Sequence, residues 1–532
     1  MTSFNRKSLG RHDFYSVHWF AERERRKARE TKMKWICSVI AACVMFCIAA
    51  GPAAAANEAG TKLPLDRIDA YARAQFDIAG IPGGAYAIVD RGRIVQAQGI
   101  GFADLASRTE AGPDTVYAVA SVTKPMTAAV VLQLAEEGRI DLDAPVKDYL
   151  PWFRYADEEA SSKVTVRQLL THSAGVNRFS ADGAIYRDVK KNRNSLENAA
   201  KALENVRMNA EPGAKGQYCN TCYNLLGLII EAATGRPYEA YMKERLFEPL
   251  GMTNASFRPP VDGSVRTAKE YGYLFGFPVE FEPYWKAFGS SQAPEGGAYA
   301  SAADLARFAA AALGYGTTEP FFALGGLEPY HRAGVPASDL NGAVYAESGF
   351  EAKRIHGVPA LEKSGEGMGS SSEIVLLPEL GVGIVLLVGE ADGEACGRIA
   401  EGIVSIVLGH PPETVEGLPN FLQLLGWVSL GLLLLGLVLF AGLIGSFVRL
   451  RRRRFETKRR WAVAARAVGF AVVGVPLWYL LFLFRPTEAG FYGYPYDFAV
   501  ALIAVAVPFS LWAAYSAWAL ALGRRSNIWR RR

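Results

Sequence analysis

Apolar residues in the first part of the chain recur with the spacings of short helices and strands. Residues 65–78 have the apolar spacing of an amphipathic helix. Residues 85–89 and 93–98 are two strand-like runs around Asp90-Arg91-Gly92, a turn sequence typical of a hairpin. A short apolar run over 116–120 leads into a helical pattern over 121–137. Pro125 lies in the first turn of that helix, and Gly138 follows its end.

The same patterns return after a long middle segment. Residues 140–260 indicate mainly helix and loop, whereas 373–377 and 383–388 are apolar runs joined by a turn at 378–381. Residues 395–408 then predict a helix. Strands at both ends with helices between them predict one α+β domain over 57–409, in which a single sheet joins the two ends of the chain.

Three long apolar runs follow this domain, after a linker over 410–420. Each of them, over 421–448, 461–484 and 498–522, is long enough to cross a bilayer. The loop 449–460 carries a net charge of +7, the loop 485–497 is aromatic and nearly neutral, and the tail 523–532 is basic. Positively charged loops stay in the cytoplasm, so we expect three transmembrane helices with the α+β domain on the outer side of a bacterial cell membrane.

Residues 1–56 predict a leader and a signal peptide. Lys34 supplies positive charge, residues 35–50 are apolar, and Ala54-Ala55-Ala56 resembles a cleavage site for the signal peptidase. Met33 is an alternative start to Met1, and an uncleaved membrane anchor is the alternative to a cleaved signal peptide. The signal peptide gives the same orientation as the basic loops.

Charge and cysteine content exclude some function classes. The net charge of the whole chain is +5, yet residues 57–420 sum to −13, so we expect no nucleic-acid partner. Of the six cysteines, three lie in the N-terminal apolar run; Cys219 and Cys222 form either a local disulfide or a pair of buried thiols, and Cys396 is the third remaining one. The four histidines between 57 and 420 show no metal-ligand spacing, so we predict no metal and no cofactor.

Ser121 and Lys124 are the first candidates for chemistry. Three residues apart at a helix start, their side chains lie on one face, where a neutral lysine could take the proton of the serine hydroxyl. Taken alone, an N-cap serine followed by a surface lysine would explain the pair as well.

Two further elements follow in the chain. Tyr218-Cys219-Asn220 precedes a helical run, so Tyr218 and Asn220 can point the same way from a loop that enters a helix. Lys363-Ser364-Gly365 comes before the strand at 373–377, where its backbone could line a substrate at the edge of a sheet. Singly, each is also explained by a buried tyrosine or a polar turn.

The order S-x-x-K, Y-x-N, K-S-G resembles the class C β-lactamase, D,D-carboxypeptidase and esterase family of serine hydrolases. The resemblance extends over about 65–408, and the further stretches that carry it are residues 164–175, 246–252, 294–299 and 301–308. It implies an antiparallel sheet flanked by helices and a separate helical region. It also implies that His172, in the first of these stretches, shapes a helix end and does no chemistry.

The resemblance assigns roles to individual residues. Ser121 would be the acylated nucleophile, and Lys124 and Tyr218 would share proton transfer. The predicted substrate-binding residues are Asn220, Lys363, Ser364, Gly365 and Glu366, with the N–H groups of Ser121 and Glu366 forming the oxyanion hole. Lysine at 363, where many esterase-like relatives carry histidine, favours substrates with a carboxylate. Glu366 departs from the usual small or polar residue and predicts weak affinity for β-lactams.

We therefore expect a membrane-anchored hydrolase that acts through an acyl-enzyme. D-amino-acid peptides of the cell wall are the first substrate class expected, small esters or amides the second, and β-lactams the third. A sensor that becomes acylated without turnover is the alternative, and a scaffold or transport component with a degenerate hydrolase domain is another. The expected partners are a small-molecule or peptide substrate and the lipids of the cytoplasmic membrane, and the sequence predicts no oligomeric state.

Overall fold

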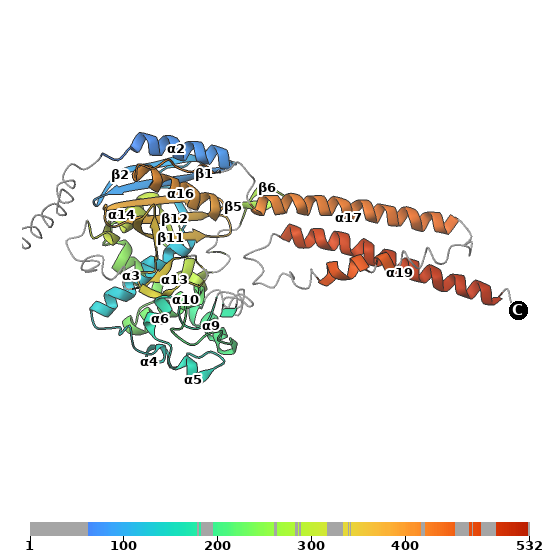
Figure 1. Ribbon diagram of the computed structural model, residues 1–532, viewed down its shortest axis with the longest axis horizontal. Coiled ribbons are helices and arrows are strands. Elements are labelled where there is room, and N and C mark those ends of the chain that lie inside the picture. The colour runs from blue at the N-terminus through green and yellow to red at the C-terminus, as the bar shows by residue number, and fades with distance from the viewer. Residues whose placement is uncertain are drawn as a thin grey trace, which may run out of the picture. The chain divides into compact units, whose positions relative to one another are not determined.

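The structure is a computed structural model. It describes residues 62–177, 180–181, 195–259, 263–281, 286, 289–315, 333–338, 340, 342–415, 421–452, 468–470, 472–479 and 496–529 (Figure 1). The leader and signal peptide predicted over 1–56 lie outside these residues, as do most of the loops 449–460 and 485–497.

One antiparallel sheet organises the α+β domain. Its nine strands lie in the order β3-β2-β1-β13-β12-β11-β10-β9-β8. Their bounds are β1 Gly83–Asp90, β2 Arg93–Asp104, β3 Thr109–Glu110, β8 Ala333–Pro336, β9 Val344–Ala346, β10 Glu351–Ile355, β11 Val358–Glu366, β12 Ser371–Leu377 and β13 Val382–Val388. The smaller sheets pair β4 (Val116–Ala118) with β7 (Tyr299–Ser301), and β5 (Tyr271–Leu274) with β6 (Phe277–Glu280).

The first and last long strands of the domain are neighbours. β1 pairs with β13 from Gly84↔Val388 to Asp90↔Val382. The prediction that one sheet joins the two ends of the domain is therefore confirmed. Every residue of β13 is buried, as expected for a strand covered on both faces.

Helices cover both faces of the sheet. α2 (Leu65–Ala79) and α16 (Gly393–Val407) pack together on one face, where a side chain at Gly402 would collide with Tyr71. α14 (Ala302–Ala312) lies on the other face, and its Phe308 shares a core with Val385 of β13. The predicted helices at 65–78 and 395–408 are confirmed to within a few residues.

A helical region extends from the face of the sheet that carries α14 (Figure 1). Its helices include α3 (Thr123–Glu136), α4 (Val146–Tyr149), α5 (Glu158–Ser161), α6 (Val166–Leu170), α9 (Leu196–Lys201), α10 (Asn220–Thr234), α11 (Tyr238–Met242) and α13 (Ala293–Gly296). α3 is apolar on nearly all sides and almost entirely buried, because α10 and α13 pack against it.

The K-S-G element lies within a strand. Lys363, Ser364 and Gly365 are part of β11, which continues to Glu366, so the alternative of an ordinary polar turn is excluded. β10 pairs with β11 only as far as Glu362, whereas β12 pairs with β11 through to Glu366. The last residues of β11 therefore border the end of the β10 ladder, which keeps the predicted sheet-edge character.

The linker predicted over 410–420 begins against the domain. The Tyr71 hydroxyl of α2 donates a hydrogen bond to the carbonyl oxygen of Glu413 (2.7 Å), and Gln75 accepts one from the N–H of Val415 (2.6 Å). Residues up to Val415 thus pack onto α2.

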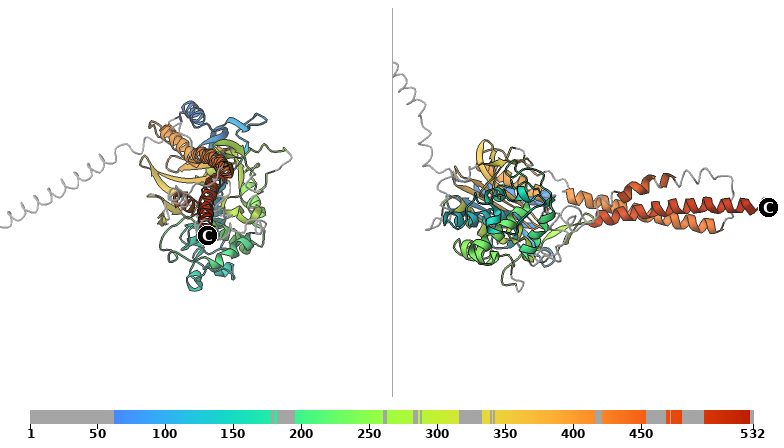
Figure 2. Two further views of the ribbon diagram at one scale, coloured as in Figure 1. Left: turned by 90° about the vertical axis from the view of Figure 1, so that its right-hand side faces the viewer. Right: turned by 90° about the horizontal axis from the view of Figure 1, so that it is seen from below.

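The C-terminal region has one helix that meets the length and apolarity of a membrane span among the residues described. α17 (Phe421–Arg452) contains this stretch, Gln423–Gly445. α19 (Tyr496–Trp529) contributes a shorter apolar stretch, Val500–Ser516, and Figure 2 shows it alongside α17. Three transmembrane helices are therefore not confirmed. The run 461–484 is described only at 468–470 and 472–479, and within the third run the apolar stretch found is Val500–Ser516.

Candidate active site

Ser121 lies in a tight turn between β4 and α3. The turn is a 3₁₀ helix, Ala120–Val122, and Thr123 begins the α-helix. Ala120 has a φ of 43°, a left-handed conformation that costs free energy for a residue with a side chain. This strained turn places Ser121 at the N-terminal end of the helix, where the serine is half-buried.

The Lys124 side chain is completely buried and directed at Ser121. Its Nζ donates hydrogen bonds to Ser121 Oγ (3.0 Å), to Asn220 Oδ1 (2.8 Å) and to the carbonyl oxygen of Glu295 in α13 (2.7 Å). An ammonium group has three donors, and these three acceptors match them in number. The alternative of an N-cap serine followed by a surface lysine is thereby excluded.

Tyr218 contacts the same serine. Its hydroxyl donates a hydrogen bond to Ser121 Oγ (2.7 Å). The centroid of its ring lies 5.0 Å from Lys124 Nζ and 5.2 Å from Lys363 Nζ, within the range of cation–π attraction. Ser121 Oγ therefore touches both groups that the sequence proposes for proton transfer, and the side chains of Lys124 and Lys363 flank the phenol ring.

His172 supports Tyr218 from behind. The two ring centroids are 4.6 Å apart, and His172 Nδ1 accepts a hydrogen bond from the N–H of Cys219 (3.1 Å). Burial lowers the pKa of His172 well below its usual range, with Lys124 and Lys363 acting in the same direction, so the imidazole is neutral. It follows α6, as the resemblance implies, and positions the tyrosine.

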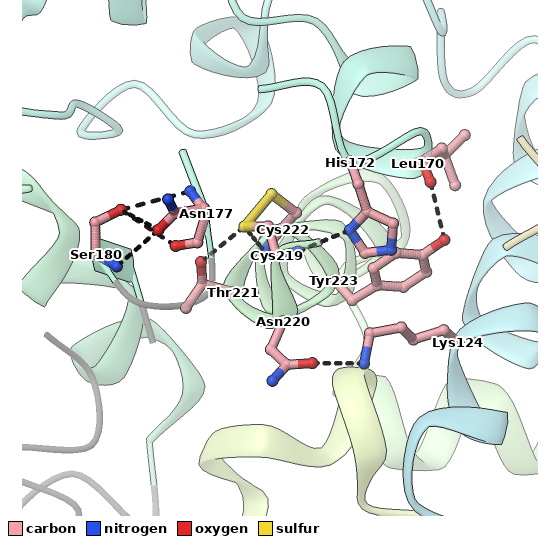
Figure 3. The surroundings of a disulfide bond; sticks show 10 residues. All are labelled: Lys124, Leu170, His172, Asn177, Ser180, Cys219, Asn220, Thr221, Cys222 and Tyr223. Atoms are coloured by element: carbon pink, nitrogen blue, oxygen red, sulfur yellow. Dashed lines mark hydrogen bonds between the residues drawn. A yellow bond between two sulfur atoms is a disulfide. The ribbon is translucent and has the colours of Figure 1, made fainter. Parts of the chain in front are cut away.

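A disulfide fixes the Tyr-x-Asn element to α10 (Figure 3). Cys219 caps the helix and is bonded to Cys222 in its first turn, with the two Cα atoms 5.5 Å apart. Of the two interpretations that the sequence left open, the disulfide is the one observed. Cys219 points toward Cys222, whereas its neighbours Tyr218 and Asn220 contact Ser121 and Lys124, as predicted.

β11 brings the third element to the site. Gly365 is buried beside the nucleophile: a Cβ built on it would lie 2.4 Å from the carbonyl oxygen of Val119 and 3.0 Å from the N–H nitrogen of Ser121. The approach of β11 to the Ser121 turn thus requires glycine at this position.

Lys363 is buried and already paired. Its Nζ donates to Glu351 Oε1 of β10 (2.8 Å), and the side chains are 3% and 13% exposed. Burial acts to lower the pKa of Lys363, but Glu351, with Tyr218 and Glu373, outweighs it and the pKa is raised, so the lysine stays charged.

The side chains of Ser364 and Glu366 are exposed and alternate with the buried Lys363 and Gly365 along the strand. The Glu366 carboxylate lies at the start of α16, where a Cβ on Gly393 would be 3.1 Å from its Oε2. A helix N-terminus stabilises a negative charge. The structure therefore directs this carboxylate toward α16, and only the backbone of Glu366 continues the strand beside Ser121.

Three groups that contribute to the site were not predicted from the sequence. They are Glu351, the carbonyl oxygen of Glu295, and Tyr345, whose ring lies 4.7 Å from that of His172. The resemblance at residues 294–299 pointed to the segment of Glu295 without giving its role. In the described part of the chain, no group of three His, Cys, Asp or Glu residues could hold a metal.

The arrangement has the parts of a nucleophilic catalyst. A hydroxyl contacts a lysine and a tyrosine, both of which can accept a proton, and the hydroxyl lies at the head of a helix beside an exposed strand end. This is the geometry expected for acyl transfer.

A family model described as Beta-lactamase matches residues 68–402. Among curated proteins, penicillin-binding protein 4 of Amycolatopsis lactamdurans is 33% identical over 196 residues, which are 37% of this chain and 50% of that protein. Protein flp of Staphylococcus aureus strain MRSA252 is 30% identical over 217 residues, 41% of this chain and 43% of that protein. The chain thus spans half or less of the length of these relatives.

Solved structures agree with the fold. The octameric penicillin-binding protein homologue from Pyrococcus abyssi superimposes with a TM-score of 0.58 at 27% identity, covering 66% of this chain and 79% of that one. A hydrolase with promiscuous acyltransferase activity, EstCE1, gives a TM-score of 0.55 at 23% identity, over 64% and 98% of the two chains, which shows a shared fold alone.

Proposed function

Because the chain belongs to the beta-lactamase family of serine hydrolases, we propose that it hydrolyses D-amino-acid peptides or related amides through an acyl-enzyme on Ser121. The observation that carries the proposal is the pair of hydrogen bonds on Ser121 Oγ, from Lys124 Nζ at 3.0 Å and from the Tyr218 hydroxyl at 2.7 Å.

In the proposed reaction, Ser121 Oγ attacks the substrate carbonyl carbon while its proton passes to Lys124 or Tyr218, whichever is deprotonated. The N–H groups of Ser121 and Glu366 stabilise the oxyanion. The leaving amine takes a proton from the same pair, and water then hydrolyses the ester on Ser121. Asn220, held by Lys124, is positioned to contact the substrate amide.

We further propose that the chain is anchored in a membrane with the hydrolase domain outside the cytoplasm. The support is the apolar stretch Gln423–Gly445 in α17, together with the distribution of basic residues in the sequence. Where the remaining apolar runs lie in the membrane is part of the same proposal.

Labelling of the full chain with a fluorescent fluorophosphonate, an uncharged reagent for activated serines, tests the nucleophile. Wild type should be labelled at Ser121, as peptide mass spectrometry would show, and Ser121→Ala should not. Turnover of an N-acylated D-alanyl-D-alanine amide separates an enzyme from a sensor, because a sensor stays acylated after one equivalent. Equal labelling of both proteins would contradict the proposal.

A further inference from the structure

We propose that Glu351 is a specificity residue. Its carboxylate pairs with Lys363 and neutralises the positive charge of that lysine, so the enzyme prefers substrates without a carboxylate beside the scissile bond. Amides, esters and internal peptide bonds are then favoured over peptides that end in a free D-alanine carboxylate. The inference rests on the proposed function and narrows its substrate class.

The ion pair leaves Lys363 little exposure to a substrate. Lys363 Nζ and Glu351 Oε1 are 2.8 Å apart and the lysine side chain is 3% exposed. The ammonium group lies against the ring of Tyr218, 5.2 Å from its centroid. β10 delivers the carboxylate because its first residue, Glu351, is paired in register with Glu362, the neighbour of Lys363.

Such a pair attracts a third charge weakly. A lysine and a glutamate in contact present no net charge, and separating them to bind a substrate carboxylate would leave Glu351 mostly buried without its partner. The cost of breaking a buried pair is large, so an incoming carboxylate gains little. An uncharged carbonyl or amide can bind while Lys363 and Glu351 remain paired.

The exposed end of β11 offers the complementary chemistry. β10 pairs with β11 only as far as Glu362, so backbone N–H and C=O groups beyond that residue can bond a neutral carbonyl or amide. The side chains of Ser364 and Glu366 alternate with those of Lys363 and Gly365, and the Glu366 carboxylate is directed toward α16. A neutral amide or ester therefore finds hydrogen-bonding groups here without needing a charged partner.

The test compares two substrates that differ by one charge. One is an N-acylated D-alanyl-D-alanine with its free carboxylate, and the other is the same compound as its C-terminal amide. We expect the full-length wild type to hydrolyse the amide with a kcat/KM at least about 10-fold higher, equivalent to about 1.4 kcal/mol. Glu351→Gln releases the lysine charge and should lower this preference at least tenfold, mainly by improving hydrolysis of the carboxylate form.

Glu401→Gln is the matched control, because Glu401 forms a Lys–Glu hydrogen bond of the same length, 2.8 Å, with Lys353. It removes one negative charge and should leave the ratio unchanged. A wild type that prefers the free carboxylate would overturn the inference even if Glu351→Gln does not fold, and so would an active Glu351→Gln with an unchanged ratio. Failure of fluorophosphonate labelling, with neither compound hydrolysed, would instead overturn the proposed function and the inference with it.

Discussion

At the scale of single residues, Gly365 sets how closely β11 approaches Ser121. In Gly365→Ala the new methyl group would meet the Val119 carbonyl oxygen at 2.4 Å, so β11 must move away from the nucleophile. We expect kcat/KM for the amide substrate to fall by about 100-fold or more, since a misplaced oxyanion donor costs that much. Gly367→Ala, whose nearest contact would be Ser370 Oγ at 3.1 Å, is the control and should stay within a few-fold of wild type.

His172 gives the protein a defined response to acid. Its pKa is lowered in the folded state by burial, so below about pH 6.5 the unfolded chain binds a proton that the folded protein does not. The contribution of the neutral His172 to the free energy of unfolding is therefore complete above this pH. It is lost as the pH falls, by up to about 1.4 kcal/mol per pH unit. His172→Gln, which keeps a hydrogen-bond acceptor for Cys219, should lack this loss.

The measurement is the difference in free energy of unfolding between wild type and His172→Gln from pH 7 to pH 5. Burial raises the pKa of Glu390 to about 7 and gives the opposite slope, but Glu390 is present in both proteins and cancels. A difference that does not change with pH would show that His172 is not held neutral.

Residue roles were predictable where the chain carries them in a local pattern. Ser121 and Lys124 are one helical turn apart, and Tyr218 and Asn220 flank one cysteine, so each pair could be read from adjacent positions. Glu351 could not, because its contact with Lys363 depends on the pairing register of β10 with β11. The direction of the Glu366 side chain likewise depends on α16, a distant element of the sequence.

At the scale of elements, the disulfide joins the candidate catalytic loop to α10. Cys219→Ser with Cys222→Ser should lower the free energy of unfolding by about 2 kcal/mol, the value for a closed loop this short. It should also reduce kcat several-fold, because Tyr218 and Asn220 lie on either side of Cys219. Thermal unfolding and amide hydrolysis measure the two effects.

A reductant should act on the wild type as the double substitution does. The control is Cys396→Ala, which removes the buried free thiol of α16 and should leave the sensitivity to reductant unchanged. Full activity after complete reduction, verified by thiol counting, would contradict the positioning role.

Elements were predictable in proportion to their apolar pattern. α2, β1, β12, β13 and α16 have strong periodicity and were found within a few residues. β10, with the sequence Glu-Ala-Lys-Arg-Ile, is short and polar, because Glu351 and Lys353 form ion pairs with neighbouring elements, and it escaped prediction. The same weakness hid that K-S-G lies within β11.

At the scale of the whole molecule, we expect the hydrolase domain to fold and react independently of the C-terminal helices. The polypeptide 62–415 retains α2, α16 and the segment that packs on α2, so it should fold without α17. It should be labelled by fluorophosphonate at Ser121 at the rate of the full chain.

In fractionated cells the full chain should sediment with membranes, and 62–415 should remain in the supernatant. A full chain in the supernatant would contradict the anchor. An unfolded 62–415, seen by circular dichroism, would show that the domain depends on the helices that follow it.

The pairing of β1 with β13 also sets an order of events during synthesis. Ser121 and Lys124 leave the ribosome long before Lys363, and the sheet that brings them together cannot close until the strands up to Val388 have emerged. Contacts so distant along the chain form slowly. A nascent chain therefore carries its serine without the strand that borders it, and the enzyme is inactive until nearly the last residue of its domain is made.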